Sequence, residues 1–238
     1  MKNRLFAGLS ALALVGAGGV VASIAMPAIA DSRSDAAALK RAADFAKAAA
    51  KATAKKKWDK AILFAENAVV LSPDDAGYRA LLGNAYLRAG RFASAEDSFA
   101  DVMTLQPDNG RIALNLALAQ IGTGKWAAAR ATLERGAGVI PAADRGLALA
   151  LAGDTQGAID VLTAATRSAD ADVKTRQNLA LAMALAGRWQ ESRTLVAMDL
   201  APAEVDKRMT EWAQFAHPVS AADQVASLLG VTPVVDPG

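Results

Sequence analysis

The stretch Leu71-Ser-Pro-Asp-Asp75 is followed later by Leu105-Gln-Pro-Asp-Asn109, and both have the order leucine, polar residue, proline, acid. Their prolines, Pro73 and Pro107, are 34 residues apart, and Pro141 comes 34 residues after the second. Self-similarity at a fixed interval of about 20–50 residues is typical of proteins built from stacked repeats. The chain of 238 residues therefore reads as a short repeat array.

Glycines and aromatic residues keep the same interval. Gly90 and Gly124 are 34 residues apart, and each is followed two residues later by an aromatic residue, Phe92 or Trp126. Glycine ends a helix at little cost in the left-handed conformation, so each unit is expected to be two helices joined at a glycine. We expect the aromatic residues to be buried anchors of the second helix. The positions expected to build the units are Trp58, Ala61, Pro73, Gly83, Tyr86, Gly90, Phe92, Ala95, Pro107, Gly124, Trp126, Ala129, Pro141, Gly153, Gly187 and Trp189.

The residues Leu82-Gly83, Tyr86, Gly90, Phe92, Ala95, Phe99 and Pro107 together resemble the tetratricopeptide repeat (TPR) family, whose unit is a 34-residue helix–turn–helix. The resemblance implies an all-α solenoid, a right-handed superhelix of about five helical hairpins with a C-terminal capping helix. The first unit has Lys56 where glycine is usual, and the fourth has Thr155 in place of the aromatic residue. The array is expected to span 42–201 (units 42–75, 76–109, 110–141, 142–170 and 171–201), followed by the capping helix 202–216 and by a short helix and flexible tail, 217–238.

The first thirty residues have the order of a secretory signal peptide. A basic start, Met1-Lys-Asn-Arg4, precedes the uncharged stretch Leu5 to Met26 and the small-residue site Ala28-Ile-Ala30. We therefore expect residues 1–30 to direct export to the periplasm, with 31–41 as a lead-in to the array. Because the apolar stretch is long for a signal peptide, an uncleaved anchor in the inner membrane is the alternative.

The composition argues against several kinds of chemistry. The chain has no cysteine and one histidine, His217, so it has too few ligands for a thiolate or multi-histidine metal site. Without residues 1–30 the basic and acidic residues are equal in number, which gives no support for nucleic-acid binding. We expect no catalytic residue, no cofactor and no metal, and hence a protein that is not an enzyme.

The resemblance also implies a concave groove lined by the first helix of each unit, where a peptide or a helix of a partner protein would bind. Ordinary exposed helix residues would show the same pattern. The groove residues that it implies are largely apolar on one side, which favours a hydrophobic or amphipathic helix over an acidic tail. The chain's own helix Ala221–Leu229 is an alternative occupant. The candidate groove residues are Asn84, Arg88, Arg111, Asn115, Leu118, Lys174, Gln177, Asn178 and Leu181.

These observations predict an exported TPR scaffold that binds another envelope protein. It is similar in kind to assembly factors of cell-surface machines, including the TPR component of tight-adherence (Flp-type) pilus assembly. The alternative is a module that binds the cell wall or a membrane surface through a basic face, Lys51, Lys55, Lys56, Lys57 and Lys60, unless these lysines only keep the end of the array soluble. The oligomeric state stays open.

Overall fold

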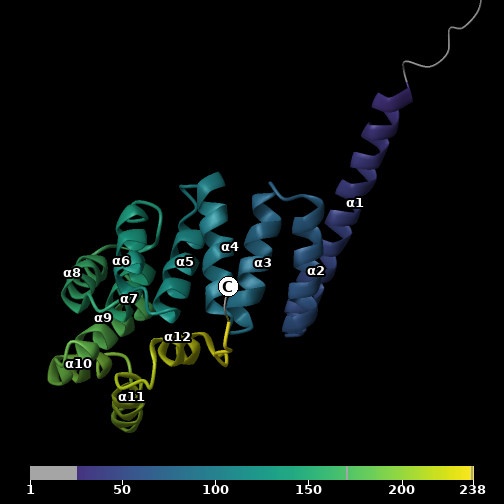
Figure 1. Cartoon of the computed structure of the whole chain (residues 1–238). Helices are drawn as coiled ribbons and strands as arrows, with labels where there is room; N and C mark the ends of the chain where they lie inside the picture. Colours follow the sequence, from purple (N-terminus) through teal and green to yellow (C-terminus); the bar gives the residue numbers. More distant parts are fainter. Residues whose placement is uncertain (1–25, 170, 237) are drawn as a thin grey trace, which may run out of the picture. The chain divides into compact units, whose positions relative to one another are not determined.

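The computed structural model describes the backbone of residues 26–169, 171–236 and 238, and the side chains from residue 35 onward; most of the predicted signal segment lies outside these residues. The described part holds twelve α-helices and no strand (Figure 1). The helices are α1 (Met26–Ala54), α2 (Trp58–Leu71), α3 (Ala76–Arg88), α4 (Phe92–Leu105), α5 (Gly110–Gly122), α6 (Trp126–Arg135), α7 (Ala142–Leu151), α8 (Thr155–Thr166), α9 (Val173–Leu185), α10 (Trp189–Val196), α11 (Pro202–Phe215) and α12 (Ala221–Leu229). Among them, none is both long enough and apolar enough to span a membrane.

The chain divides into two compact units, residues 1–37 and 38–238, and the repeats belong to the second. Within that unit each helix from α2 to α10 packs on the next one along the chain. The all-α fold of repeated helical hairpins is as predicted. The boundary predicted at residue 42 does not appear, because α1 is one continuous helix that includes the lead-in 31–41.

The turns inside the hairpins use the backbone conformation that the glycines predict. Gly90, Gly124, Gly153 and Gly187 have φ between 75° and 81°, in the left-handed region. Lys56 stands at the same place in the first unit and has φ 53°, although it is not glycine. A side chain in this region is strained, so the first unit keeps the turn at some energetic cost.

The acids and asparagine after the prolines cap the helices that follow. Asp75 accepts a hydrogen bond from the backbone N–H of Tyr78 (3.0 Å), and Asn109 accepts one from Ile112 (3.2 Å). Each satisfies one of the N–H groups that the first turn of a helix leaves unpaired. The repeated Pro-Asp motif therefore ends one hairpin and starts the next.

Small residues let the two helices of a hairpin approach each other. A Cβ atom on Gly83 would lie 2.8 Å from the ring of Phe99, which is fully buried. Tyr86 joins the first two units, since its hydroxyl donates to Glu66 (2.7 Å). Burial, followed by this hydrogen bond to a carboxylate, raises the pKa of Tyr86.

The aromatic anchors are not equally buried, which corrects one prediction. Phe92 is 4% exposed, because Gly122 of the next unit packs directly on its ring. Trp126 holds the equivalent position but is 49% exposed. Helix α7 has 10 residues where α5 has 13, so the next unit is too short to cover the indole. Trp58 and Trp189 are partly buried.

We therefore expect the two equivalent anchors to respond differently to truncation. Phe92→Ala should lower the free energy of unfolding by about 3–5 kcal/mol, as for a buried aromatic residue. Trp126→Ala should cost less than about 1.5 kcal/mol, because half of its surface is already in water. Urea denaturation followed by circular dichroism measures both, and equal losses would contradict this account.

The C-terminal tail, residues 231–236, is not the loose segment predicted. Helix α12 begins as expected at Ser220, whose hydroxyl accepts a hydrogen bond from the N–H of Asp223 (3.1 Å). After Gly230 the chain returns to the turn between α3 and α4, where the N–H of Val234 donates to the carbonyl of Gly90 (3.1 Å). Backbone and carboxylate contacts to that turn hold the tail in place of a packed apolar face.

Candidate functional site

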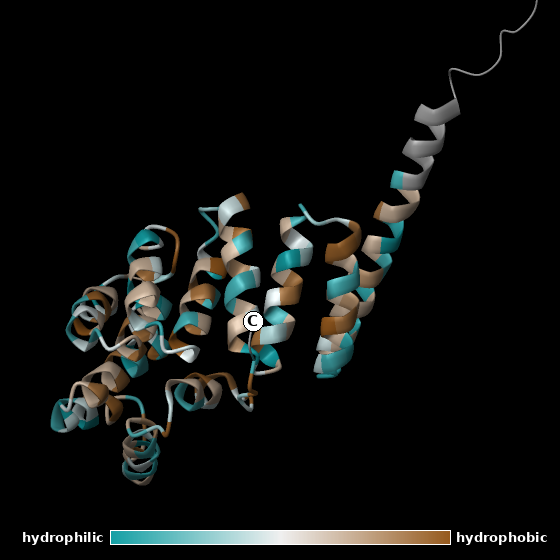
Figure 2. Cartoon of the chain, in the orientation of Figure 1, coloured by the Kyte–Doolittle hydropathy of each residue, from teal (hydrophilic) through white to brown (hydrophobic). Residues whose placement is uncertain are grey.

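Helix α12 lies against α5, the helix that carries three of the predicted groove residues (Figure 1). Val225 is fully buried and Ala226 is 3% exposed, and both belong to the main apolar cluster of the array. Apolar residues are seen on both α5 and α12 (Figure 2). The chain's own helix therefore covers part of the face that the sequence pattern assigns to a partner.

Two of the predicted asparagines contact each other across the second and third units. The side-chain amide of Asn115 donates to the side-chain oxygen of Asn84 (3.0 Å), and the amide of Asn84 donates to the carbonyl of Ala80 (2.7 Å). Both side chains are half-buried. The structure thus brings this pair together on α3 and α5.

Asn178 has a different environment from Asn115, although the same five residues surround both in the sequence. It is 8% exposed, and its amide donates to the backbone carbonyl of Ala143 (2.9 Å). A buried, paired amide holds α9 to α7 and is not available to a ligand. The prediction of Asn178 as a groove residue is therefore wrong. The short fourth unit places the start of α7 where a ligand was expected.

The remaining predicted residues of α9 are also engaged within the chain. Lys174 forms an ion pair with Asp144 (2.6 Å). Gln177 donates to Asp199 (3.3 Å) and accepts from Arg208 (3.3 Å). Leu181 is 8% exposed and packs in the same cluster as Val205 and Trp212 of α11. The α9 residues therefore belong to the cap of the array, separate from the α3–α5 pair.

Asp199 is the central acid of this cap. Its side chain is 8% exposed and accepts hydrogen bonds from Arg176, with 2.6 Å to the guanidinium Nη2. This hydrogen bond lowers the pKa of Asp199 below its ordinary value, and the same contact raises the pKa of Arg176. A carboxylate whose pKa is lowered by folding stabilises the folded state above its unfolded pKa, and the contribution is lost as the pH falls.

We expect Asp199→Asn to be destabilising at neutral pH and nearly neutral in acid. The unfolded carboxyl group titrates near about pH 4, so the difference in unfolding free energy between wild type and variant should shrink below about pH 4. Below the folded pKa, wild type carries a protonated acid, which resembles the amide. Urea unfolding at about pH 7 and at about pH 2.5 measures this difference. A gap that does not change with pH would contradict the ion-pair explanation.

Arg88 and Arg111 are exposed, whereas Leu118 is 7% exposed and belongs to the main core. Arg88 donates to the backbone carbonyl of Leu229 at the end of α12 (3.1 Å). Of the predicted set, Asn84, Arg88, Arg111 and Asn115 therefore remain on or beside the α5 face, and Leu118 supports it from the interior. Ser94 and Asp236, which join the tail to α4, are absent from the predicted set, because nothing in the repeat pattern signals contacts with the tail.

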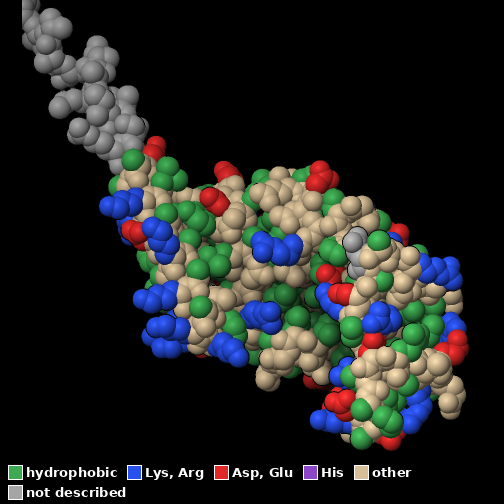
Figure 3. Space-filling view, turned by 180° about the vertical axis from the view of Figure 1, so that it is seen from behind, with side chains coloured by type: hydrophobic (Ala, Val, Ile, Leu, Met, Phe, Trp, Pro, Cys, Tyr) green, Lys and Arg blue, Asp and Glu red, His purple; other side chains and the backbone are tan. Residues whose placement is uncertain are grey.

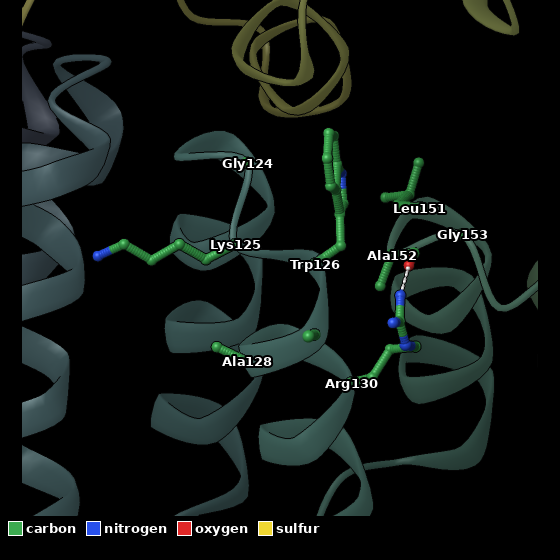
Figure 4. A pocket seen from close by; sticks show the side chains of 9 residues that line it. Gly124, Lys125, Trp126, Ala128, Arg130, Leu151, Ala152 and Gly153 are labelled. Atoms are coloured by element: carbon green, nitrogen blue, oxygen red, sulfur yellow. Dashed lines mark hydrogen bonds between the residues drawn. The ribbon is translucent and has the colours of Figure 1, made fainter.

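A hollow of about 700 Å³ lies beside Trp126, at the turns of the third and fourth units (Figure 4). Lys125 at its edge is paired with Glu96 (3.0 Å), and Arg130 donates to the carbonyl of Ala152 (2.7 Å). The residues described by the structure include no group of three or more histidine, cysteine or acidic side chains that could hold a metal ion. The hollow offers an aromatic face and no evident reacting group.

The basic face is exposed, in agreement with the sequence pattern. Lys51, Lys55, Lys56, Lys57 and Lys60 all point into water, and Lys40, Arg41 and Lys47 extend the positive charge along α1. Basic side chains line this edge in the space-filling view (Figure 3). Among the ion pairs of residues 35–169 and 171–236, none involves these eight side chains.

Comparisons with known proteins agree with the fold. Residues 88–151 match the family model described as "Tetratricopeptide repeat". Similar solved structures include the MamA protein (18% identity, 74% of this chain and 93% of that one, TM-score 0.55) and YrrB, "a TPR protein with an unusual peptide-binding site" (18%, 81% and 99%, 0.56). TTC0263, a thermophilic TPR protein of Thermus thermophilus, is also similar (20%, 73% and 99%, 0.53). No curated protein matches the chain.

Proposed function

Because the chain carries tetratricopeptide repeats in a helical solenoid, a fold that serves as a scaffold for protein–protein interaction, we propose that it binds an amphipathic helix of another protein on the α5 face. The face consists of Asn84 and Arg88 on α3 and of Arg111 and Asn115 on α5, supported by Leu118. No group in it suggests catalysis.

The observation that carries the proposal is the position of α12. A short helix lies on α5 and buries Val225 and Ala226 there, so this face accepts an apolar helical stripe. Such a helix in a groove is a common mode of peptide recognition. A partner helix of the same pattern would replace α12.

The place of action that we propose is the bacterial cell envelope. The basic start, apolar stretch and Ala28-Ile-Ala30 site support export, with an uncleaved inner-membrane anchor as the alternative. An exported scaffold of this kind suits the assembly of a pilus or secretion machine, and the partner would be another component of that machine.

A second candidate function rests on the basic face. Eight exposed basic side chains along α1 and the start of α2 form no ion pair among the described residues, a distribution that attracts anionic polymers and lipid headgroups. On this account the chain would hold to the cell wall or to a membrane surface.

One pair of charge reversals distinguishes the two functions. Arg88→Glu with Arg111→Glu alters the α5 face, and Lys55→Glu with Lys57→Glu alters the basic face by the same charge; all four positions are exposed. The tagged proteins are used to capture partners from envelope extract and are co-sedimented with peptidoglycan and anionic vesicles. A scaffold loses its protein partner with the first pair only. Loss of sedimentation with the second pair, with capture unchanged in both, supports the surface module instead.

A further inference from the structure

The tail makes a specific set of contacts at the turn between α3 and α4. The N–H of Val234 donates to the carbonyl of Gly90 (3.1 Å). Asp236 accepts two hydrogen bonds from Ser94, one from the backbone N–H and one from the hydroxyl, each 2.8 Å. A short extended segment thus binds by one backbone hydrogen bond and one doubly paired carboxylate.

The turn is suited to such a segment. A Cβ atom on Gly90 would lie 1.9 Å from the carbonyl oxygen of Thr232, so only glycine lets the tail approach this closely. Arg91, at the cap position of α4, provides no side-chain cap. Asp236 takes over that role from 142 residues away, where the unpaired N–H groups and the helix dipole favour a carboxylate.

The repeat provides an internal comparison. Gly124 and Ala128 are the equivalents of Gly90 and Ser94 in the next unit, and Gly124 has nearly the same φ (75° against 76°). No atom lies within 4 Å of a Cβ atom placed on Gly124. The tail's contacts therefore come from residues particular to the second unit, and the repeat fold by itself does not produce them.

The tail is held weakly enough to exchange. Val235 is 99% exposed and Val234 is 50% exposed, so its aliphatic side chains bury little surface. What holds it is polar contact, together with the high local concentration that comes from being part of the same chain. A segment with the same polar groups and better apolar contacts would displace it.

We propose that the α3–α4 turn is a second peptide site, which takes an extended segment of a partner protein with an aspartate three residues after a proline, as in Pro233–Asp236. The chain's own tail occupies the site until such a segment competes. The proposal deepens the proposed function, on which it rests, by naming a further feature of the partner. Displacement of the tail also removes the connection that holds the end of α12 beside Arg88.

The test follows the amide signal of Ser94 by NMR while a synthetic peptide of residues 230–238 is added to the full chain. Asp236→Ala in the chain frees the site, and this variant should bind the peptide at least about tenfold more tightly than wild type does. A peptide that carries the same Asp236→Ala change should not shift the signal. Alanine is used because asparagine can still cap a helix.

Two glycine variants complete the test. Gly90→Ala should expel the tail and also fail to bind the peptide, because the added carbon occupies the position of the peptide carbonyl. Gly124→Ala, with the same backbone strain and no contact, should leave the Ser94 signal as in wild type. Equal binding by wild type and Asp236→Ala, or binding of both peptides alike, overturns the proposal. Envelope capture through Arg88 and Arg111 is read separately, so its failure is distinguishable.

Discussion

Gly146→Val is expected to lower the free energy of unfolding by about 3 kcal/mol. A Cβ atom at Gly146 would lie 2.4 Å from Cγ of Leu162 and 2.9 Å from both of its methyl groups. Leu162 is fully buried, and its branched Cγ cannot move aside as the end of a long side chain would. The contact between α7 and α8 would have to open, and valine adds its own cost in a helix.

Gly138→Val is the matched control, since nothing lies within 4 Å of a Cβ atom at Gly138 and its φ lies outside the left-handed region. We expect a change within about 0.5 kcal/mol, as for most surface substitutions. Urea denaturation of both variants measures the difference. A Gly146→Val protein as stable as Gly138→Val would mean that the α7–α8 contact is looser than the structure shows.

Gly146 also marks the limit of what the repeat pattern predicts. The register of the repeat identifies Gly83 and Phe99, and the structure places them in contact. In the fourth unit the same kind of contact is made by Gly146 and Leu162, but the unit is shortened and the register is lost. Hairpins, turns and caps follow from local sequence, so they could be predicted. Contacts across a shortened unit depend on where the neighbouring helices come to lie.

The candidate site shows the same division. Asn115 and Asn178 are preceded and followed by similar residues, so the sequence offers no reason to separate them. In the structure Asn115 contacts Asn84, whereas the start of α7 covers Asn178 through the carbonyl of Ala143. Backbone carbonyls carry no sequence signal. For the same reason the contact of the tail with Gly90 could not be predicted.

The largest functional change is expected from Val225→Asp. Val225 is fully buried between α12 and the array, and a carboxylate there would lose its hydration without gaining a partner. Helix α12 should leave α5, while the hairpins stay folded because α12 is outside the repeat array. The loss of burial corresponds to about 1.5–3 kcal/mol.

Release of α12 should expose the α5 face to a helix added in trans. A fluorescent peptide of residues 219–238 is expected to bind the Val225→Asp chain at least about a hundredfold more tightly than wild type, whose own helix competes at a high effective concentration. Ser227→Asp is the matched control, because it adds the same charge to the exposed side of α12 and should behave as wild type. Fluorescence anisotropy measures both affinities.

The two outcomes separate a binding face from a structural cap. If α12 only completes the core, Val225→Asp exposes a surface that collapses or aggregates, and the peptide binds no better than it does to Ser227→Asp. If the α5 face recognises helices, the freed surface is specific, so a peptide with Val225→Asp should not bind it. Since Arg88 receives the end of α12 from the neighbouring unit, an Arg88→Ala chain should hold the added peptide more weakly while its unfolding midpoint barely changes. That difference between affinity and stability is what recognition by α3 and α5 requires.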